Sequence, residues 1–104
     1  MRTAGKLQAY VKLERVGRNV ILAICDVEIL GKTFRDGKIV FCVKEGFYKG
    51  DRVNVDEAIC MIENCTIANM VGKNVVNRAI EKGYVHPDAV LDIKGVPHAQ
   101  IVKF

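Results

Sequence analysis

The sequence predicts an α+β fold: a mostly antiparallel sheet of about five strands, with an αα-hairpin packed on one of its faces. Three observations lead to this prediction. Two segments near the N-terminus have strand-like patterns, the middle of the chain has helical spacing, and short strand-like segments return at the end. With 104 residues, half of them apolar, the chain is expected to form a single globular domain over residues 1–104.

The first two strands are expected to form a hairpin. In "LQAYVKLE", residues 7–14, the odd-numbered side chains are apolar and most of the even-numbered ones are polar, as in a half-exposed strand. "NVILAICD", residues 19–26, is apolar almost throughout and rich in β-branched residues, which is typical of a strand covered on both faces. The intervening "RVGRN" contains the glycine and asparagine of a tight turn.

The next segment is expected to contribute one more strand. "EILGKTFRDGK" is loop-like, with a turn signal at Asp36-Gly37. "KIVFCVK", residues 38–44, is predicted to be a third strand that is apolar on both faces. In the following connection, "EGFYKGDRVN", Phe47 and Tyr48 are expected to fold back onto the core.

Two helices and two short strands are predicted for the second half. Asn54 and Glu57 have the spacing of a capping box, and the apolar stripe that follows predicts a helix ending at Gly72. A second helix, over residues 74–83, would complete the αα-hairpin. The strands are "VLDIK" and "QIVKF", with a turn from Gly95 to His98 between them.

Composition and cysteine spacing exclude several classes of protein. No apolar run approaches the length of a membrane span, and the start has no secretory signal pattern, so a cytoplasmic protein is expected. Cysteines at positions 25, 42, 60 and 65 lack the spacing of a metal site, and no phosphate-cradling glycine motif occurs. We therefore expect buried, inert thiols and neither metal nor cofactor; a Cys25–Cys42 disulfide is the remaining alternative.

Positive charge is concentrated in the N-terminal half. Residues 1–54 contain eleven Lys or Arg against six Asp or Glu, whereas residues 55–104 contain five against six. Such a surface would suit the phosphates of a nucleic acid, with an exposed tyrosine to stack on a base. The candidate nucleic-acid-binding residues are Tyr10, Lys12, Arg15, Arg18, Lys32, Arg35 and Lys38. The alternative is a charged rim without a partner.

One combination of residues could support nucleophilic catalysis. Cys25 and Asp26 end the second predicted strand, and His98 lies in the final turn. A nearby histidine can lower the pKa of a thiol enough for attack at neutral pH. The alternative is that His98 is a turn residue whose polar atoms are satisfied locally.

The five short motifs "AICD", "ILGKTF", "GFYKG", "IANMVG" and "GVPHAQ" occur in this order along the chain. Their sequence and order resemble those of an archaeal family, domain of unknown function 424. The resemblance runs from about Tyr10 to Gln100. It implies a small archaeal protein with an α+β fold, without an established activity, whose genes tend to lie near translation genes. It also implies a shared functional surface around Asp26, Asn69, His98 and Gln100.

Three hypotheses follow for function. The first is a non-enzymatic binding module that contacts RNA or a translation component through the basic half. The second is a small enzyme with a site around Cys25, Asp26 and His98. The third is a protein–protein adaptor or homodimer that pairs through an uncovered strand edge such as "QIVKF".

Overall fold

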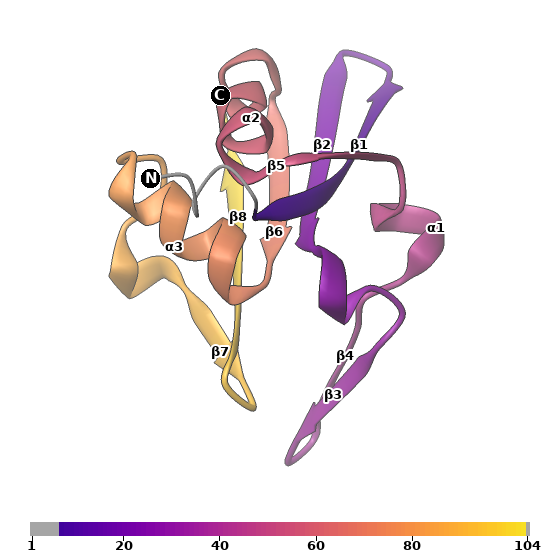
Figure 1. Ribbon diagram of the computed structural model, residues 1–104, viewed down its shortest axis with the longest axis vertical. Coiled ribbons are helices and arrows are strands. Elements are labelled where there is room, and N and C mark those ends of the chain that lie inside the picture. The colour runs from indigo at the N-terminus through magenta and orange to yellow at the C-terminus, as the bar shows by residue number, and fades with distance from the viewer. Residues whose placement is uncertain (1–6, 104) are drawn as a thin grey trace.

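Eight strands form two sheets within residues 7–103, the part of the chain that the computed structural model describes (Figure 1). The strands are β1 (Gln8–Val16), β2 (Asn19–Asp26), β3 (Thr33–Asp36), β4 (Ile39–Cys42), β5 (Asp51–Asn54), β6 (Ile67–Val71), β7 (Leu91–Ile93) and β8 (Val96–Val102). The α-helices are α1 (Glu45–Tyr48), α2 (Val55–Cys60) and α3 (Lys73–Glu81). Short 3-10 helices are η2 (Val27–Ile29), η3 (Met61–Asn64) and η4 (Pro87–Ala89).

The larger sheet has six strands in the order β5-β1-β2-β6-β8-β7. All neighbours run antiparallel except β2 and β6, which are parallel. The α+β class is confirmed, but the sheet is mixed and has one strand more than the five expected. No helix within residues 7–103 has the length and apolar character that a membrane crossing requires.

Buried side chains fill both faces of this sheet. On one face, Leu22, Ile24 and Met70 pack under α2 and α3, which contribute Ile59 and Val76. These side chains are at most 1% exposed, and burying each aliphatic one contributes roughly 1.5–3 kcal/mol. The larger core therefore lies between the sheet and its two main helices.

The opposite face has a smaller core beneath α1. It comprises Ala23, Cys25, Val43, Tyr48 and Val71. Tyr48 is only 4% exposed, so the expected folding back of this segment onto the core is confirmed for Tyr48. Its neighbour Phe47 remains exposed and meets the Tyr48 ring edge-on.

The predicted helix from Asn54 to Gly72, and with it the αα-hairpin, is wrong. Asn54 does cap α2, because its side chain accepts a hydrogen bond from the Glu57 amide at 2.7 Å. The helical turns end at Asn64, however, and β6 follows. Four of the five residues of β6 are apolar, which leaves too little alternation to distinguish this short central strand from a continued helix.

Residues 33–42 form a separate two-stranded hairpin, β3–β4, where the sequence suggested a loop followed by a covered strand. The Asp36-Gly37 turn joins its strands, and Phe34 lies directly opposite Phe41. Ile39 and Val40 are 47% and 54% exposed, so the expectation of burial on both faces is wrong. The hairpin projects from the body and packs on it through Phe34 and Phe41 at its base (Figure 1).

The final turn also differs from the prediction. Lys94 and Gly95 have φ values of 55° and 81° and form the β7–β8 turn, so β8 begins at Val96. His98 consequently lies within a strand and not in a bend. The predicted strand "QIVKF" corresponds to the end of β8, which pairs with β6, although Phe104 lies outside the described residues.

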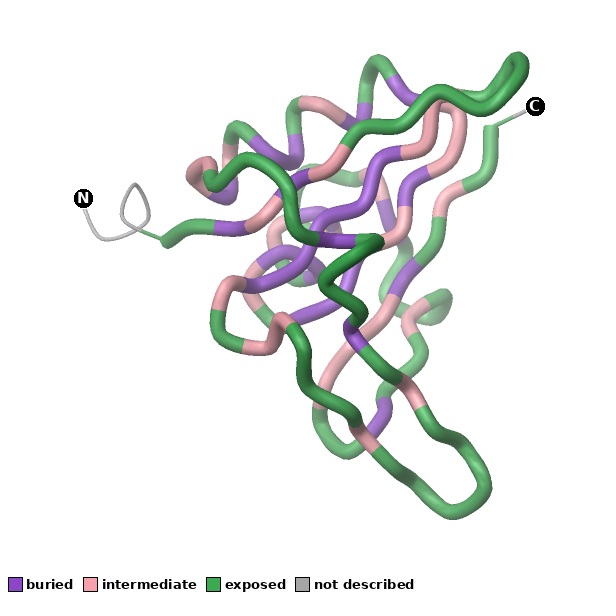
Figure 2. The backbone as a smooth tube through the Cα atoms, turned by 90° about the vertical axis from the view of Figure 1, so that its right-hand side faces the viewer, coloured by how far each residue is buried: buried purple, intermediate pink, exposed green. Residues whose placement is uncertain are grey.

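Both long hairpins bend toward the same side of the sheet. The β1–β2 turn lies at the top and the β3–β4 turn at the bottom, near opposite ends of the 40 Å long axis (Figure 1). Seen from the side, both tips extend away from the helices (Figure 2). They therefore flank the face of the sheet opposite to α2 and α3.

Candidate functional site

Beside the part of the sheet that α1 covers, the face opposite to α2 and α3 presents two rows of accessible side chains. Lys12 pairs with Ala23, Ala23 pairs with Asn69, and Asn69 pairs with Gln100. Lys12, Asn69 and Gln100 therefore lie in one row across the sheet. The adjacent row contains Glu14, Ile21, Ile67 and Val102. All seven side chains are exposed or half-buried, and we call them the open face: Lys12, Glu14, Ile21, Ile67, Asn69, Gln100 and Val102.

Three of the four residues in the predicted shared surface are on this side of the sheet. Asn69 lies directly opposite Gln100, and His98 lies opposite Val71, two residues from Asn69. Alternation along a strand places all three on one face. The structure thus brings Asn69 together with His98 and Gln100, which lie 29 and 31 residues further along the sequence.

Asp26, the fourth residue, belongs to a different environment. It ends β2, and its carboxylate accepts hydrogen bonds from the backbone amides of Asn74 at 2.9 Å and Val75 at 3.0 Å. These amides lie in the first turn of α3, where N–H groups lack partners within the helix. Asp26 therefore caps α3 and does not join the other three residues.

Burial partly removes water from the Asp26 carboxylate, and this desolvation disfavours its charged form. Burial raises the pKa of Asp26 above its ordinary value, and the amides of Asn74 and Val75 offset only part of that effect. A hollow of about 290 Å³ lies beside it, lined in part by Gly72, Lys73 and Asn74. Both carboxylate oxygens already accept hydrogen bonds from the helix, which indicates a structural role for Asp26.

The proposed Cys25–His98 pair is not assembled. Both residues lie opposite Val71, Cys25 from β2 and His98 from β8, so strand β6 runs between them. Two strand spacings separate their backbones by about 10 Å. The two residues are therefore too far apart for the hydrogen bond that a thiol and its base require.

The environments of these two side chains also oppose catalysis. Burial, followed by the nearby charges of Asp26 and Glu28, raises the pKa of the Cys25 thiol to about 12. Burial lowers the pKa of His98, whose ring packs against Phe41 with centroids 5.0 Å apart. Cys25 is thus an inert core thiol, and His98 supports the base of the β3–β4 hairpin.

Alkylation at pH 7 tests this assignment. Cys25 is expected to be the slowest of the four cysteines, because its sulfur is buried and its thiolate is disfavoured. Cys42 and Cys60 are exposed and should react first; Cys65 is buried. Peptide mass spectrometry after timed labelling gives each rate, with His98→Ala as the paired variant. Preferential labelling of Cys25, slowed by His98→Ala, would restore the catalytic hypothesis.

The cysteine prediction is confirmed in part. Cys25 and Cys65 are buried, whereas Cys42 and Cys60 are exposed, so burial does not extend to all four thiols. All four are free, and Cys25 and Cys42 do not form a disulfide. Within residues 7–103, no group of three or more His, Cys, Asp or Glu side chains is arranged to hold a metal ion.

The predicted cations divide into two groups and do not form one continuous stripe. Arg15 and Arg18 flank the β1–β2 turn, whereas Lys32, Arg35 and Lys38 belong to the β3–β4 hairpin. Lys12 lies between the groups on the open face, and its Nζ donates to the Gly46 carbonyl at 2.5 Å. Among residues 7–103, none of the six cations forms an ion pair. Arg2 and Lys6, also counted in the basic half, lie outside the described residues.

Tyr10 is not the open stacking platform that the sequence suggested. The side chain is half-buried, and the guanidinium carbon of Arg52 lies 6.0 Å from the centroid of its ring. Arg52 also donates from Nε to the Gln8 side chain at 2.6 Å. The β1–β5 edge therefore holds Tyr10 against a cation of the protein itself.

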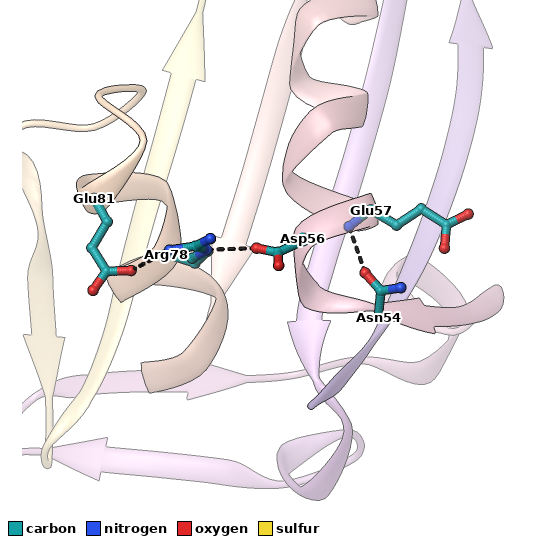
Figure 3. A network of polar contacts seen from close by, with 5 residues as sticks. All are labelled: Asn54, Asp56, Glu57, Arg78 and Glu81. Carbon is teal, nitrogen blue, oxygen red and sulfur yellow. Dashed lines mark hydrogen bonds and ion pairs between the residues drawn. The ribbon is translucent and has the colours of Figure 1, made fainter. Parts of the chain in front are cut away.

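The helix side of the molecule has a different charge arrangement. Arg78 of α3 is held between Asp56, at 2.5 Å, and Glu81, at 2.9 Å (Figure 3). Asn54 caps α2 beside this network through the Glu57 amide. Here carboxylates neutralise Arg78, whereas the ion pairs within residues 7–103 do not involve the hairpin cations. The two sides of the sheet therefore present different electrostatic surfaces.

Sequence reasoning identified the open-face residues individually but not their arrangement. The sequence places Lys12 among the candidate cations, and the family resemblance places Asn69 and Gln100 in the predicted shared surface. Their common row depends on the parallel pairing of β2 with β6, which joins segments about 45 residues apart. Once β6 is recognised as a strand, the alternation of Ala68 and Met70 with Asn69 is the signal that places Asn69 opposite the helices.

Comparisons with known proteins agree with this fold. A crystal structure of an uncharacterized conserved protein from Methanopyrus kandleri is similar with a TM-score of 0.79 and 23% sequence identity, covering 93% of this chain and 94% of that chain. A search of curated proteins gave no match. The model of the family described as "Protein of unknown function (DUF424)" matches residues 14–104. The resemblance seen in the short motifs is thereby confirmed, and the chain belongs to the DUF424 family.

Proposed function

We propose that the protein is a non-enzymatic binding module that contacts RNA, alone or within the translation machinery, through the open face and the two basic hairpins beside it. The observation that carries this proposal is the placement of the cations. Five of them lie on hairpins that bend to the same side of the sheet, and none of these forms an ion pair within residues 7–103. Alternation along β1 places Arg15 on the helix side with Val11, whereas Lys12 lies on the open face. Unpaired Lys and Arg side chains are the groups that neutralise nucleic-acid phosphates.

The shape of the hairpins supports contact with an extended polyanion. Their tips lie near opposite ends of the 40 Å axis, so one ligand would have to span most of the molecule to meet both. A phosphate backbone carries charges at regular intervals over such a length. A small anion would meet only one of the two groups.

The carboxylates of the helix side favour the same orientation. Asp56 and Glu81 neutralise Arg78, and Glu57 and Glu63 are exposed on α2 and η3. Together, α2, η3 and α3 with its C-cap Lys82 carry four carboxylates against the three cations Lys73, Arg78 and Lys82, so a polyanion approaching this side would meet a small excess of negative charge. RNA is therefore expected to approach the open face.

Binding to RNA should fall steeply as salt rises. Each cation that contacts a phosphate releases condensed counterions, so the logarithm of the affinity decreases in proportion to the logarithm of the salt concentration. With five or six such contacts, raising salt from about 50 to 200 mM should weaken binding by roughly a thousandfold. Fluorescence anisotropy with labelled total RNA measures this slope. Absence of RNA binding at low salt would refute the proposal.

A further inference from the structure

The open face also indicates the form of RNA that it fits, an inference that rests on the proposed function. Proteins that hold single strands present aromatic side chains on which successive bases stack. One row of the open face carries Lys12 and the amides of Asn69 and Gln100, and the other carries Glu14 and three aliphatic side chains. Of the rings near this face, Tyr10 is held against Arg52, His98 packs on Phe41, and the exposed Phe47 meets the Tyr48 ring edge-on.

From this geometry we infer that the ligand is double-stranded RNA, recognised by its backbone and shape, with the amides of Asn69 and Gln100 reading the 2′-hydroxyl. A duplex keeps its bases stacked inside and presents phosphates and 2′-hydroxyls, so it needs no stacking platform on the protein. The two basic hairpins supply the phosphate contacts, and the face between them supplies hydrogen-bonding groups.

The Asn69–Gln100 pair has the chemistry that a 2′-hydroxyl requires. Their residues lie directly opposite each other on β6 and β8, and Gln100 is exposed while Asn69 is half-buried. Each amide offers one acceptor oxygen and two donor hydrogens, and a 2′-hydroxyl both donates and accepts. Lys12 lies in the same row, where its charge favours an adjacent phosphate. DNA lacks the hydroxyl and would leave the amides without that partner.

The test compares three probes of one sequence: an RNA duplex of about 20 base pairs, the matching DNA duplex, and one RNA strand. The duplex is longer than the roughly 16 base pairs that a double-stranded-RNA domain spans. At one fixed low salt concentration, anisotropy should give at least about tenfold tighter binding to the RNA duplex than to either other probe. The double variant Asn69→Ala with Gln100→Ala should bring the RNA-to-DNA preference close to one while the salt slope stays unchanged.

A matched control is Asn64→Ala with Asn77→Ala, which removes two exposed amides on the helix side and should leave the preference intact. Should the Asn69 substitution impair folding, as checked by circular dichroism, Gln100→Ala alone should still reduce the preference. If the single RNA strand bound as tightly as the RNA duplex or more tightly, the inference of a duplex ligand would be wrong, but the proposed RNA binding would still be supported. If the variant with Asn69→Ala and Gln100→Ala kept its preference for RNA over DNA, the assignment of these amides to the 2′-hydroxyl would be wrong. If neither RNA probe bound, the proposed function and this inference would both be wrong.

Discussion

Reversing one arginine on each basic hairpin is expected to weaken RNA binding by roughly a hundredfold at low salt. Arg18→Glu alters the β1–β2 turn and Arg35→Glu alters β3, so the double variant removes a cation from each end of the proposed ligand path. Each substitution deletes a phosphate contact and adds repulsion, and the salt slope should fall by about one unit for each lost contact. Adding Arg15→Glu should abolish measurable binding. Anisotropy titrations at several salt concentrations measure both quantities.

The control for this prediction is Lys73→Glu with Lys82→Glu on the helix side. Both double variants lower the net charge from +4 to 0, because each substitution changes it by two units. Lys73 and Lys82 are exposed, so folding should be preserved. If the helix-side pair weakened binding as much as the hairpin pair, net charge alone would account for affinity, and the assignment to the two hairpins would be wrong.

Gly72→Ala should destabilise the fold by at least about 3 kcal/mol. Gly72 precedes α3 with a φ of +116°, a backbone conformation that side chains of L-residues rarely adopt. A Cβ atom at this position would lie 2.3 Å from Cγ of Asp26, the carboxylate that caps α3. Thermal denaturation should show a loss of roughly 12 °C or more for a domain of this size.

Two further variants separate the causes of that loss. Gly46→Ala serves as the control, since no neighbouring atom lies within 4 Å of its Cβ position, and it should change stability by less than about 1 kcal/mol. Combining Gly72→Ala with Asp26→Ala removes the clash, so the double variant should lose less than the sum of the two single losses. A Gly72→Ala protein as stable as the natural one would contradict the close approach of β2 to the start of α3.

Local patterns predicted the elements that depend on neighbouring residues. The β1–β2 hairpin follows from alternation and a glycine turn, the start of α2 from the Asn54 cap, and α3 from its own apolar stripe. These signals act over a few residues, and the same forces act in the isolated segment. They were accordingly sufficient without knowledge of the rest of the chain.

The errors arose where distant segments decide the structure. Four of residues 67–71 are apolar, Asn69 being the exception, because β6 is a central strand, and its pairing with β2 and β8 distinguishes it from a continued helix. Residues 33–36 pair with 39–42 in a ribbon that is partly exposed, so apolar Ile39 and Val40 gave a false signal of burial. Both cases reflect tertiary context that local propensity does not contain.

The candidate site illustrates the same distinction. Individual residues such as Lys12, Arg18 and Asn69 could be selected from the sequence by their chemistry. Their relation in space depends on strand register and on the direction in which two hairpins bend. The same register separates Cys25 from His98 by one strand and turns Asp26 toward α3, which removes the catalytic interpretation.

The most direct test of the proposed binding surface is the change in backbone amide chemical shifts when an RNA duplex is added to the 15N-labelled protein at low salt. The account predicts shifts at Arg18, Arg35 and Lys38 of the two hairpins, and at Asn69 and Gln100 between them, with little change in α3. Shifts concentrated in α2 and α3, or an unchanged spectrum at saturating RNA, would contradict the assignment of the open face as the RNA-binding surface.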